Sequence, residues 1–592
     1  MTLLAAPGNA GGTGRTGSPS APSEPGSPAH ADLERRAPAQ RRDPQRIAAG
    51  VSLVILLVLA IIALTRVDIS IPGMFESASN AERFFARVGS LKFPEPAELL
   101  HLTVLTVGLV LTGTVLAAAL SVPVAYLAAA NTSPSPGWRA LARFVGVLTR
   151  AVPDVVLAMV FVLLFSLGSL PGILAIGIHS IGMISKLFAD AIEQIDEGPR
   201  LAVRAAGGSK LQEFTVGILP QVLPSWVATV LHRNDINLRG SVVLGYVGVA
   251  GLGLEMSHAF KSLNYGLGLG IALVIFVLCV VMEVVSSAVR VTMLGEQAGK
   301  GVFVKLLSHA GSGGAARGSA PTADPRFASV DSALRRPWPA ARVRNTAAAW
   351  LALAVVIAGV IVSGIVWSDF FTFWAKLPAV AASFWPPNFG NYGFATIFAA
   401  MVETVEIALA ATLLTFIASV VIGSLAARNV APNPATRSGF RLLLVGIRGI
   451  PELILAIVLI VITGLGAQAG TIALAFGGIG LLGKLIADSL EEVPRGPERA
   501  LIANGASRTQ MYFGATVPQG AQALIGHTFY LLDTNVRAAT LLGIVGGGGV
   551  GYYLLNAGQG SNYQLVGSIV LMILVVVLCV EGLAMWLRKA LR

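Results

Sequence analysis

The segment from Gly198 to Pro220, GPRLAVRAAGGSKLQEFTVGILP, is repeated later in the chain as GPERALIANGASRTQMYFGATVP, from Gly496 to Pro518. The offset is 298 residues (496 minus 198). Both copies are polar and basic, and both stand between strongly apolar segments. A polar helix–turn–helix that projects from a bundle of membrane spans is suited to dock a soluble partner. We therefore predict two docking loops, formed by Gly198, Ala202, Ala205, Gly207, Ser209 and Pro220 and by Gly496, Ala500, Ala503, Gly505, Ser507 and Pro518.

The composition places the chain in a membrane. Its 592 residues are 54% hydrophobic and only 12% charged, and their mean hydropathy is +0.74. A soluble chain of this length needs far more charged side chains to cover its surface. The net charge of +11 could indicate nucleic-acid binding, but the basic residues cluster between apolar runs, as they do in cytoplasmic loops. We therefore predict an all-α polytopic membrane protein that binds no nucleic acid.

Two segments rich in Gly, Ala, Pro and Ser divide the chain. Such segments bury too little apolar surface to fold, so we predict a disordered cytoplasmic tail over 1–45 and a cytoplasmic linker over 296–345. The transmembrane domains then cover 46–295 and 346–592. Basic residues beside the first and last spans place both termini in the cytoplasm. The expected spans lie near 47–65, 101–130, 141–167, 171–192, from 219, 265–290, 346–366, 399–427, 440–463, 469–490, 517–533 and 562–587.

The repeat between the two domains is direct. The same offset holds without a gap from Thr106 and Thr404 to Gly253 and Gly551. Because an even number of spans returns each half to its starting side, both halves share one topology. They can therefore be related by a pseudo-two-fold axis along the membrane normal.

A second shared motif, D-x-N-x-R followed by a glycine-rich end, stands after the start of the fifth span of each half. Its three polar residues do not all share one face of a regular helix, so we expect an extended or unwound stretch, which the following glycines would permit. One interpretation is an anion path through the membrane. The other is an Asp–Arg pair that neutralises itself and fixes the helix break. The residues are Asp235, Asn237 and Arg239, and Asp533, Asn535 and Arg537.

A third shared motif, R-x-x-P-[DE], interrupts the third span of each half. Proline removes one hydrogen bond of a helix and kinks it. We favour a structural hinge, in which the acid pairs with the arginine or with a loop of the other half. The residues are Arg150, Pro153 and Asp154, and Arg448, Pro451 and Glu452.

Other patterns favour structure over chemistry. The run GGIGLLGK at 477–484 is similar to a phosphate-binding loop, but Leu485 replaces the required hydroxyl and no strand precedes it. Its glycines are expected to let helices pack closely. Lys186 and Asp190 are expected to form an i,i+4 pair. Because the histidines do not cluster and no nucleophile stands beside a base, we predict no catalytic residue, no metal site and no ATPase site in this chain.

Together the three motifs resemble those of the PhnE-type phosphonate permeases of ABC importers. The loop A-x-x-A-x-G-[GA]-S-[KR], which ends in P-Q, is similar to the EAA loop of ABC importer permeases, although Leu201 and Arg499 replace its first acidic residue. The motif D-x-N-x-R-x-x-x-x-L-G-x-V-G-x-x-G is the most specific of the three. The resemblance covers about 100–290 and 398–588. This chain departs from the family pattern by joining two permease domains in one polypeptide.

The resemblance implies a fold, partners and a location. Each half would be a six-helix type I importer domain, MetI-like, in which five helices follow an outer first helix. Two copies of a PhnC-like ATPase, which hold ATP and Mg, would bind the docking loops, and an extracytoplasmic PhnD-like protein would deliver the substrate. The chain itself would bind no cofactor and would lie in the bacterial plasma membrane. The implied substrate is a phosphonate, phosphite or phosphate, which share a tetrahedral oxyanion.

Two other classes of protein compete with this interpretation. An ion-gradient-driven secondary transporter of an anion could also consist of two parallel repeats. It would need acidic or histidine proton relays in the membrane and no repeated cytoplasmic loop. A membrane assembly factor could use the loops as a scaffold, but it would have no need of the paired D-x-N-x-R motifs.

Overall fold

The computed structural model describes residues 44–590 apart from 70–79, 85, 87 and 295–339. The predicted tail and linker lie outside the described residues, except at 44–45 and 340–345. Every regular element in the described part of the chain is helical. The all-α prediction is therefore confirmed.

The long helices follow the predicted spans in chain order. The first half contains α2 (Pro44–Arg66), α4 (Pro96–Ala128), α5 (Pro136–Ala151), α6 (Asp154–Phe165), α7 (Ser169–Glu193), α10 (Leu219–Gly245), α11 (Leu252–Lys261) and α12 (Tyr265–Leu294). The second half contains α15 (Ala340–Val362), α16 (Asp369–Ser383), α17 (Gly393–Ala426), α18 (Pro434–Gly449), α19 (Glu452–Thr463), α20 (Ala467–Glu492), α23 (Val517–Ile544), α24 (Val550–Gln559) and α25 (Tyr563–Ala590).

Not every predicted span is a straight apolar helix. Eight of the described helices are long and apolar enough to cross a membrane, and the number rises to ten if each of two bent helix pairs is one span. The bends are 84° between α5 and α6 and 77° between α18 and α19. Two expected spans are not among these ten. One is α15, whose apolar part is short, at Thr346–Val362. The other is α23, which is not among the helices apolar enough to cross a membrane.

Each bend lies at the X-Pro step of the R-x-x-P-[DE] motif. Proline cannot donate a backbone hydrogen bond within a helix, and it pushes the residue before it to extended angles. Val152 and Ile450 accordingly have ψ angles of 122° and 118°. Asp154 and Glu452 then begin the next helix, where a negative charge is favourable. The interruption predicted from the sequence is therefore a sharp bend in both halves.

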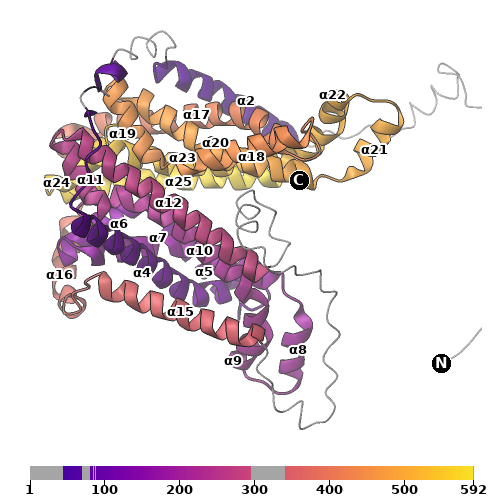
Figure 1. Ribbon diagram of the computed structural model, residues 1–592, viewed down its shortest axis with the longest axis horizontal. Coiled ribbons are helices and arrows are strands. Elements are labelled where there is room, and N and C mark those ends of the chain that lie inside the picture. Colours follow the sequence, from indigo (N-terminus) through magenta and orange to yellow (C-terminus); the bar gives the residue numbers. More distant parts are fainter. Residues whose placement is uncertain (1–43, 70–79, 85, 87, 295–339, 591–592) are drawn as a thin grey trace, which may run out of the picture.

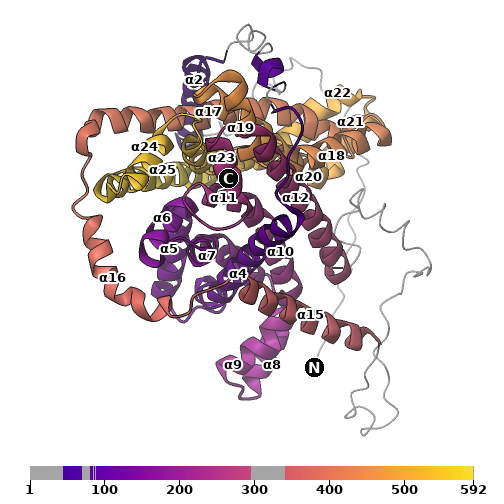
Figure 2. The same ribbon diagram turned by 60° about the vertical axis from the view of Figure 1, so that its left-hand side comes forward.

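The first helix of each half packs against the other half (Figures 1 and 2). α2 lies along α17, where Arg66 Nη1 is 2.7 Å from Glu406 Oε1. α15 lies along α4, where a Cβ on Gly108 would stand 3.0 Å from the carbonyl oxygen of Gly359. Gly108 and Glu406 occupy equivalent repeat positions (406 minus 108 is 298). The two contacts therefore use different chemistry, and the two halves of the sequence are interleaved in space.

Glycines set the close packing of α7 and α20 against their neighbours. A side chain on Gly182 would collide with the carbonyl of Gly146, so α5 lies directly against α7. In the second half, a Cβ on Gly480 would stand 2.9 Å from the backbone nitrogen of Arg448. The run GGIGLLGK lies wholly within α20. Its glycines serve helix packing, as predicted, and form no phosphate-binding loop.

The glycine-rich end after D-x-N-x-R lets the chain fold back on itself. A side chain on Gly245, the last residue of α10, would collide with the backbone of Gly253 in α11. In the second half, a Cβ on Gly543 would stand 2.9 Å from the Cα of Gly551 in α24. Two backbones approach this closely only where neither residue carries a side chain. The glycine-rich end therefore permits a close approach of two backbone segments in both halves.

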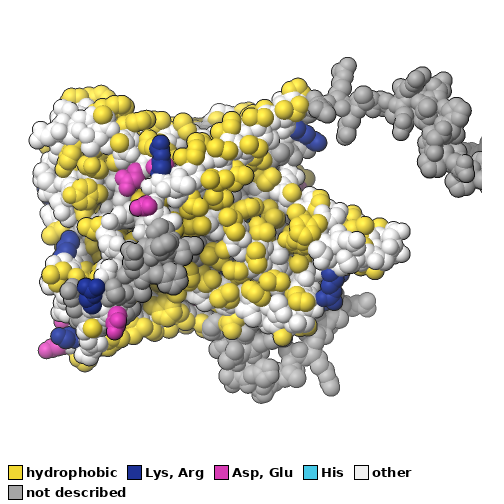
Figure 3. Space-filling view, turned by 90° about the horizontal axis from the view of Figure 1, so that it is seen from above, with side chains coloured by type: hydrophobic (Ala, Val, Ile, Leu, Met, Phe, Trp, Pro, Cys, Tyr) yellow, Lys and Arg dark blue, Asp and Glu magenta, His cyan; other side chains and the backbone are white. Residues whose placement is uncertain are grey.

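The outer surface suits a lipid environment. Figure 3 shows hydrophobic side chains across the middle of the molecule, with charged side chains mainly toward its two ends. Large apolar side chains of α2, such as Val51, Val54 and Ile55, are exposed. Exposed apolar surface on this scale would aggregate in water, but it is expected of a protein that contacts lipid.

We predict that Gly245→Ala destabilises the chain, because the added methyl group meets the backbone of Gly253 and cannot be accommodated by a side-chain movement. Overpacking of this kind costs about 1–3 kcal/mol. Thermal unfolding of the purified chain in detergent would measure the loss. The control is Gly582→Ala in α25, where a Cβ meets nothing within 4 Å. A Gly245→Ala variant as stable as this control would contradict the prediction.

Candidate functional site

Both predicted docking loops form a helix, a glycine turn and a second helix. The first comprises α8 (Glu197–Ala205) and α9 (Lys210–Gln212), and the second comprises α21 (Arg495–Ala503) and α22 (Arg508–Met511). Gly207 and Gly505 take φ angles of 81° and 75°, which side-chain-bearing residues adopt at a cost. Ser209 and Ser507 each begin the second helix with a capping box. Figure 1 shows both elements projecting from the same end of the molecule.

Each docking element continues into a long helix that crosses the protein. A π-helical segment over 213–218 joins α9 to α10, and another over 512–516 joins α22 to α23. In the first half, the whole run Lys210–Gly245 forms one candidate membrane span of 36 residues. Each docking element is therefore continuous with the helix that bears the D-x-N-x-R motif.

An asparagine anchors each docking element to the loop after the second span. Asn131 Nδ2 donates to Glu197 Oε1 at 2.8 Å and to the Ile192 carbonyl at 2.8 Å. Its repeat mate Asn429 donates in the same way to Glu498 Oε1 at 3.0 Å. The two glutamates are not repeat mates, since they are 301 residues apart (498 minus 197). Each half thus places an acid in its docking helix at a different position, so the shared motif predicts neither glutamate.

The D-x-N-x-R residues lie on regular helix, so the expected extended or unwound stretch is wrong. α10 and α23 continue through the motif and end several residues later. Asp and Arg, four residues apart, share one face and form ion pairs at 2.8 Å in the first half and 2.7 Å in the second. The asparagine, two residues from each, lies on another face of the helix and needs a different partner. The pairs are Asp235–Arg239 and Asp533–Arg537.

The asparagines of the motif fix the helices within their own half. Asn237 Nδ2 donates to Thr114 Oγ1 at 2.9 Å, and Asn535 Nδ2 donates to Thr412 Oγ1 at 2.9 Å. Each bond joins the motif helix to the second span. With the carboxylate and the guanidinium already paired, the geometry favours the self-neutralising interpretation of the motif over the anion path.

The arginines of R-x-x-P-[DE] reach across to the other half instead of pairing with their own acid. Arg150 forms an ion pair with Glu581 of α25. Arg448 Nη2 lies 3.3 Å from His232 Nδ1 of α10. Asp154 instead accepts a hydrogen bond from the backbone of its own helix, at Val155. The hinge motif therefore connects the two halves at the level of the bends.

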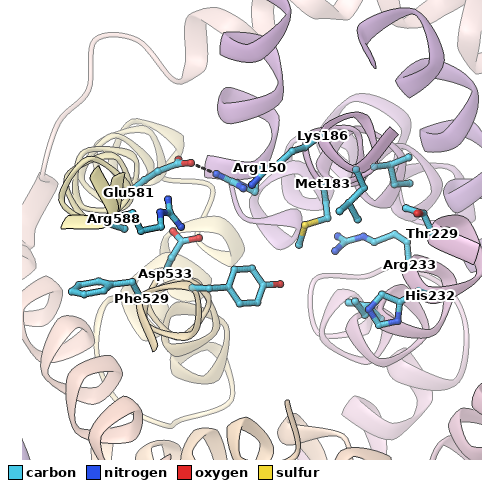
Figure 4. A pocket seen from close by; sticks show the side chains of 15 residues that line it. Arg150, Met183, Lys186, Thr229, His232, Arg233, Phe529, Asp533, Glu581 and Arg588 are labelled. Carbon is cyan, nitrogen blue, oxygen red and sulfur yellow. Dashed lines mark hydrogen bonds and ion pairs between the residues drawn. The ribbon is translucent and has the colours of Figure 1, made fainter. Parts of the chain in front are cut away.

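A cavity of about 240 Å³ lies between the two halves, lined by α5, α7 and α10 on one side and α23 and α25 on the other (Figure 4). Its charged side chains are four cations and two carboxylates. Both carboxylates are neutralised by arginines, so the cavity has an excess of positive charge. The charged lining residues are Arg150, Lys186, Arg233, Asp533, Glu581 and Arg588.

The sequence did not predict that Lys186 and Arg233 line this cavity. Among the described residues, Lys186 forms no ion pair with Asp190, and it lines the cavity instead. Arg233 belongs to no shared motif, because its repeat position is Leu531 (531 minus 233 is 298). Motifs common to both halves do not contain a residue that only one half carries. The available signal was an arginine within an otherwise apolar part of a predicted span.

A bundle of two pseudo-equivalent helical halves, with a charged cavity between them and two docking elements at one end, defines a membrane transport component. Residues 121–290 and 419–592 match the family described as "Binding-protein-dependent transport system inner membrane component". One match falls in each half, and together they cover more than half of the chain. The chain therefore belongs to this family, whose members are the permease components of ABC importers.

Three relatives illustrate the similarity. "Phosphate-import permease protein PhnE" of Mycolicibacterium smegmatis is 38% identical over 531 residues, covering 90% of this chain and 93% of that protein. "Phosphite transport system permease protein PtxC" of Stutzerimonas stutzeri is 37% identical over 31% of this chain and 67% of its own length. "Probable D-methionine transport system permease protein MetI" of Haemophilus influenzae is 30% identical over 29% of this chain and 86% of its own length.

We predict that Asp235 and Arg239 act as a mutually neutralising pair. Arg239→Leu leaves the buried carboxylate of Asp235 without its partner, which costs about 3–5 kcal/mol. Asp235→Leu should cost less, because Arg239 Nη2 also lies 4.0 Å from Glu283 Oε2. The double variant removes both charges and should recover most of that stability. Thermal unfolding of the purified single and double variants would measure the coupling. Losses that simply add in the double variant would show that the two side chains act independently.

Proposed function

We propose that this chain supplies both transmembrane domains of an ATP-driven importer for a phosphorus oxyanion, namely phosphate, phosphonate or phosphite. The observation that carries the proposal is the similarity to the M. smegmatis phosphate-import permease, which extends over both halves and 90% of the chain. The similarity to a phosphite transport permease supports the same class of substrate. The positive charge of the central cavity suits the passage of an anion.

The docking elements provide for partners that supply energy. We infer that each one binds one copy of a PhnC-like ATPase, which holds ATP and Mg, and that this chain binds no cofactor itself. A PhnD-like binding protein would deliver the substrate at the opposite face. In this arrangement the docking elements and both termini face the cytoplasm, and the chain lies in the bacterial plasma membrane. The exposed apolar side chains Leu211 on one docking element and Phe513 on the other are suited to such contacts.

The geometry supports a direct mechanical link from ATPase to cavity. When two ATPase subunits close, they would draw the docking elements together. Because each element is continuous with α10 or α23, that movement would rotate helices that line the cavity from opposite sides. The ion pair between Arg150 and Glu581 crosses the same interface, so it must be broken or re-formed as the halves move. Alternating access then follows from movement of one half against the other.

We predict ATP-dependent uptake by proteoliposomes that contain this chain, its ATPase and its binding protein. Radiolabelled phosphate would accumulate in the presence of ATP, and phosphonate and phosphite would compete with it. A complex with an ATPase variant that cannot hydrolyse ATP is the control and should show only background uptake. Uptake that follows a proton gradient without the ATPase would instead support a secondary transporter.

We predict that the paired variant Gly207→Val and Gly505→Val loses the ATPase. Both positions have positive φ, which a β-branched residue adopts only at a cost of about 1–2 kcal/mol or more, so both glycine turns would be distorted. Co-purification of the ATPase should fall about tenfold, while the chain itself remains monodisperse. Gly439→Val, at an open position of α18, is the matched control. Normal ATPase recovery with the paired variant would exclude these turns from docking.

A further inference from the structure

Arg233 is unusual among the cavity cations because the repeat does not account for it. Arg150, Lys186 and Arg588 have basic residues at the equivalent positions of the other half, at 448, 484 and 290. Arg233 alone is matched by an apolar residue, Leu531. Residues present in both halves can belong to the shared fold. A cation carried by one half alone needs a separate explanation.

The side chain that holds Arg233 is also present in one half only. Arg233 Nε donates to Ser180 Oγ of α7 at 2.9 Å. At the equivalent position, residue 478, α20 carries glycine (478 minus 180 is 298), and a Cβ there would stand 3.4 Å from Leu531. Arginine with serine in one half is therefore replaced by leucine with glycine in the other. Because both residues differ together, we infer that Arg233 and Ser180 act as a pair on the first-half side of the interface.

The arrangement leaves the charged end of Arg233 available. Arg233 is only 8% exposed. Among the described residues it forms no ion pair with a carboxylate, and the carboxylate of Asp154 attracts it only from beyond ion-pair distance. A charged group in the membrane interior without a directly paired counter-ion is costly. Ser180 takes the Nε–H, so the two terminal nitrogens remain for another acceptor. Figure 4 shows the side chain extending from α10 toward the middle of the cavity.

The other charges of the cavity favour an anion at this point. The carboxylates of Asp533 and Glu581 are already paired with Arg537 and Arg150, so they are not free to neutralise Arg233. Lys186 and Arg588 line the same cavity, and neither has an ion-pair partner among the described residues. A guanidinium with two free parallel N–H groups matches two oxygens of a tetrahedral oxyanion.

We propose that Arg233, oriented by Ser180, is the principal anion-binding residue of the translocation path. It forms one subsite for a tetrahedral phosphorus oxyanion, on the first-half side of the pseudo-two-fold axis. Lys186 and Arg588 supply additional positive charge around it. The second half offers no equivalent subsite, because Leu531 and Gly478 fill that position with apolar contacts. The identity of the anion rests on the proposed function, whereas the position of the subsite rests on the cavity itself.

The first test measures binding without transport. The full-length chain in lipid nanodiscs is unfolded thermally with inorganic phosphate or with chloride at equal ionic strength. A ligand that binds only the folded state raises the unfolding temperature. Phosphate should stabilise the native chain, and Arg233→Leu, which copies the second half, should lose that shift, corresponding to about a 10- to 100-fold loss of affinity. Arg233→Lys, which keeps the charge but not the two parallel N–H donors of the guanidinium, should retain part of the shift in unfolding temperature.

The control removes a positive charge elsewhere. Arg139→Leu lies in the first turn of α5, outside the cavity lining, and should keep the full phosphate shift. Ser180→Gly should weaken the shift without removing the cation. Equal stabilisation of the native chain and of Arg233→Leu by phosphate would overturn the proposal. So would the absence of any shift with phosphate, phosphite and methylphosphonate.

The second test separates this proposal from the proposed function. In the reconstituted complex, Arg233→Leu should lower phosphate uptake at least tenfold while ATPase co-purification stays normal. Uptake that is ATP-dependent but unchanged in Arg233→Leu would keep the importer and reject the subsite. A native complex that transports none of the oxyanions, but whose phosphate shift requires Arg233, would keep the subsite and reject the importer.

Discussion

Two bends at Pro153 and Pro451 impose the constraint on which the interface between the halves depends. A helix that breaks inside a membrane leaves backbone carbonyls without partners, and lipid cannot supply donors for them. Side chains of the protein must therefore do so. His179 Nδ1 lies 3.0 Å from the carbonyl of Val152, and Arg537 of the second half donates to the carbonyl of Arg150 at 3.4 Å. The second of these bonds makes the break in one half a contact point for the other.

This constraint links the three shared motifs into one mechanical unit. The docking element continues into the helix that carries D-x-N-x-R, and the arginine of that motif in the second half reaches the bend created by R-x-x-P-[DE] in the first. The same bend brings Arg150 to Glu581. A movement of the docking element would therefore act on contacts between the two halves at the cavity wall, namely those of Arg150 with Arg537 and Glu581. Motifs that are far apart in the sequence lie along one route from the docking end to the cavity.

Most of the fold could be predicted because its signals are periodic or repeated. Apolar runs gave the spans, and the constant offset gave the equivalence of the halves. The docking elements were predictable from Gly207 and Ser209, since a glycine turn and a capping box are local features. The prediction of an unwound stretch at D-x-N-x-R was wrong because it assumed that all three polar residues must lie on one face. Asp235 and Arg239 alone are four apart and pair on a regular helix, while Asn237 bonds to a different neighbour.

Other features could not follow from the repeat, because they are departures from it. The first helix of each half packs against the other half through the contacts Arg66–Glu406 and Gly108–Gly359. No local sequence pattern predicts these contacts. Arg233 is a departure of the same kind. A chain that joins both halves can vary each half independently, whereas two copies of one shorter chain would carry every substitution twice. Fusion therefore permits Arg233 to line the cavity without a second arginine at the equivalent position of the other half. The absence of that second arginine avoids the repulsion between two buried guanidinium groups at close range.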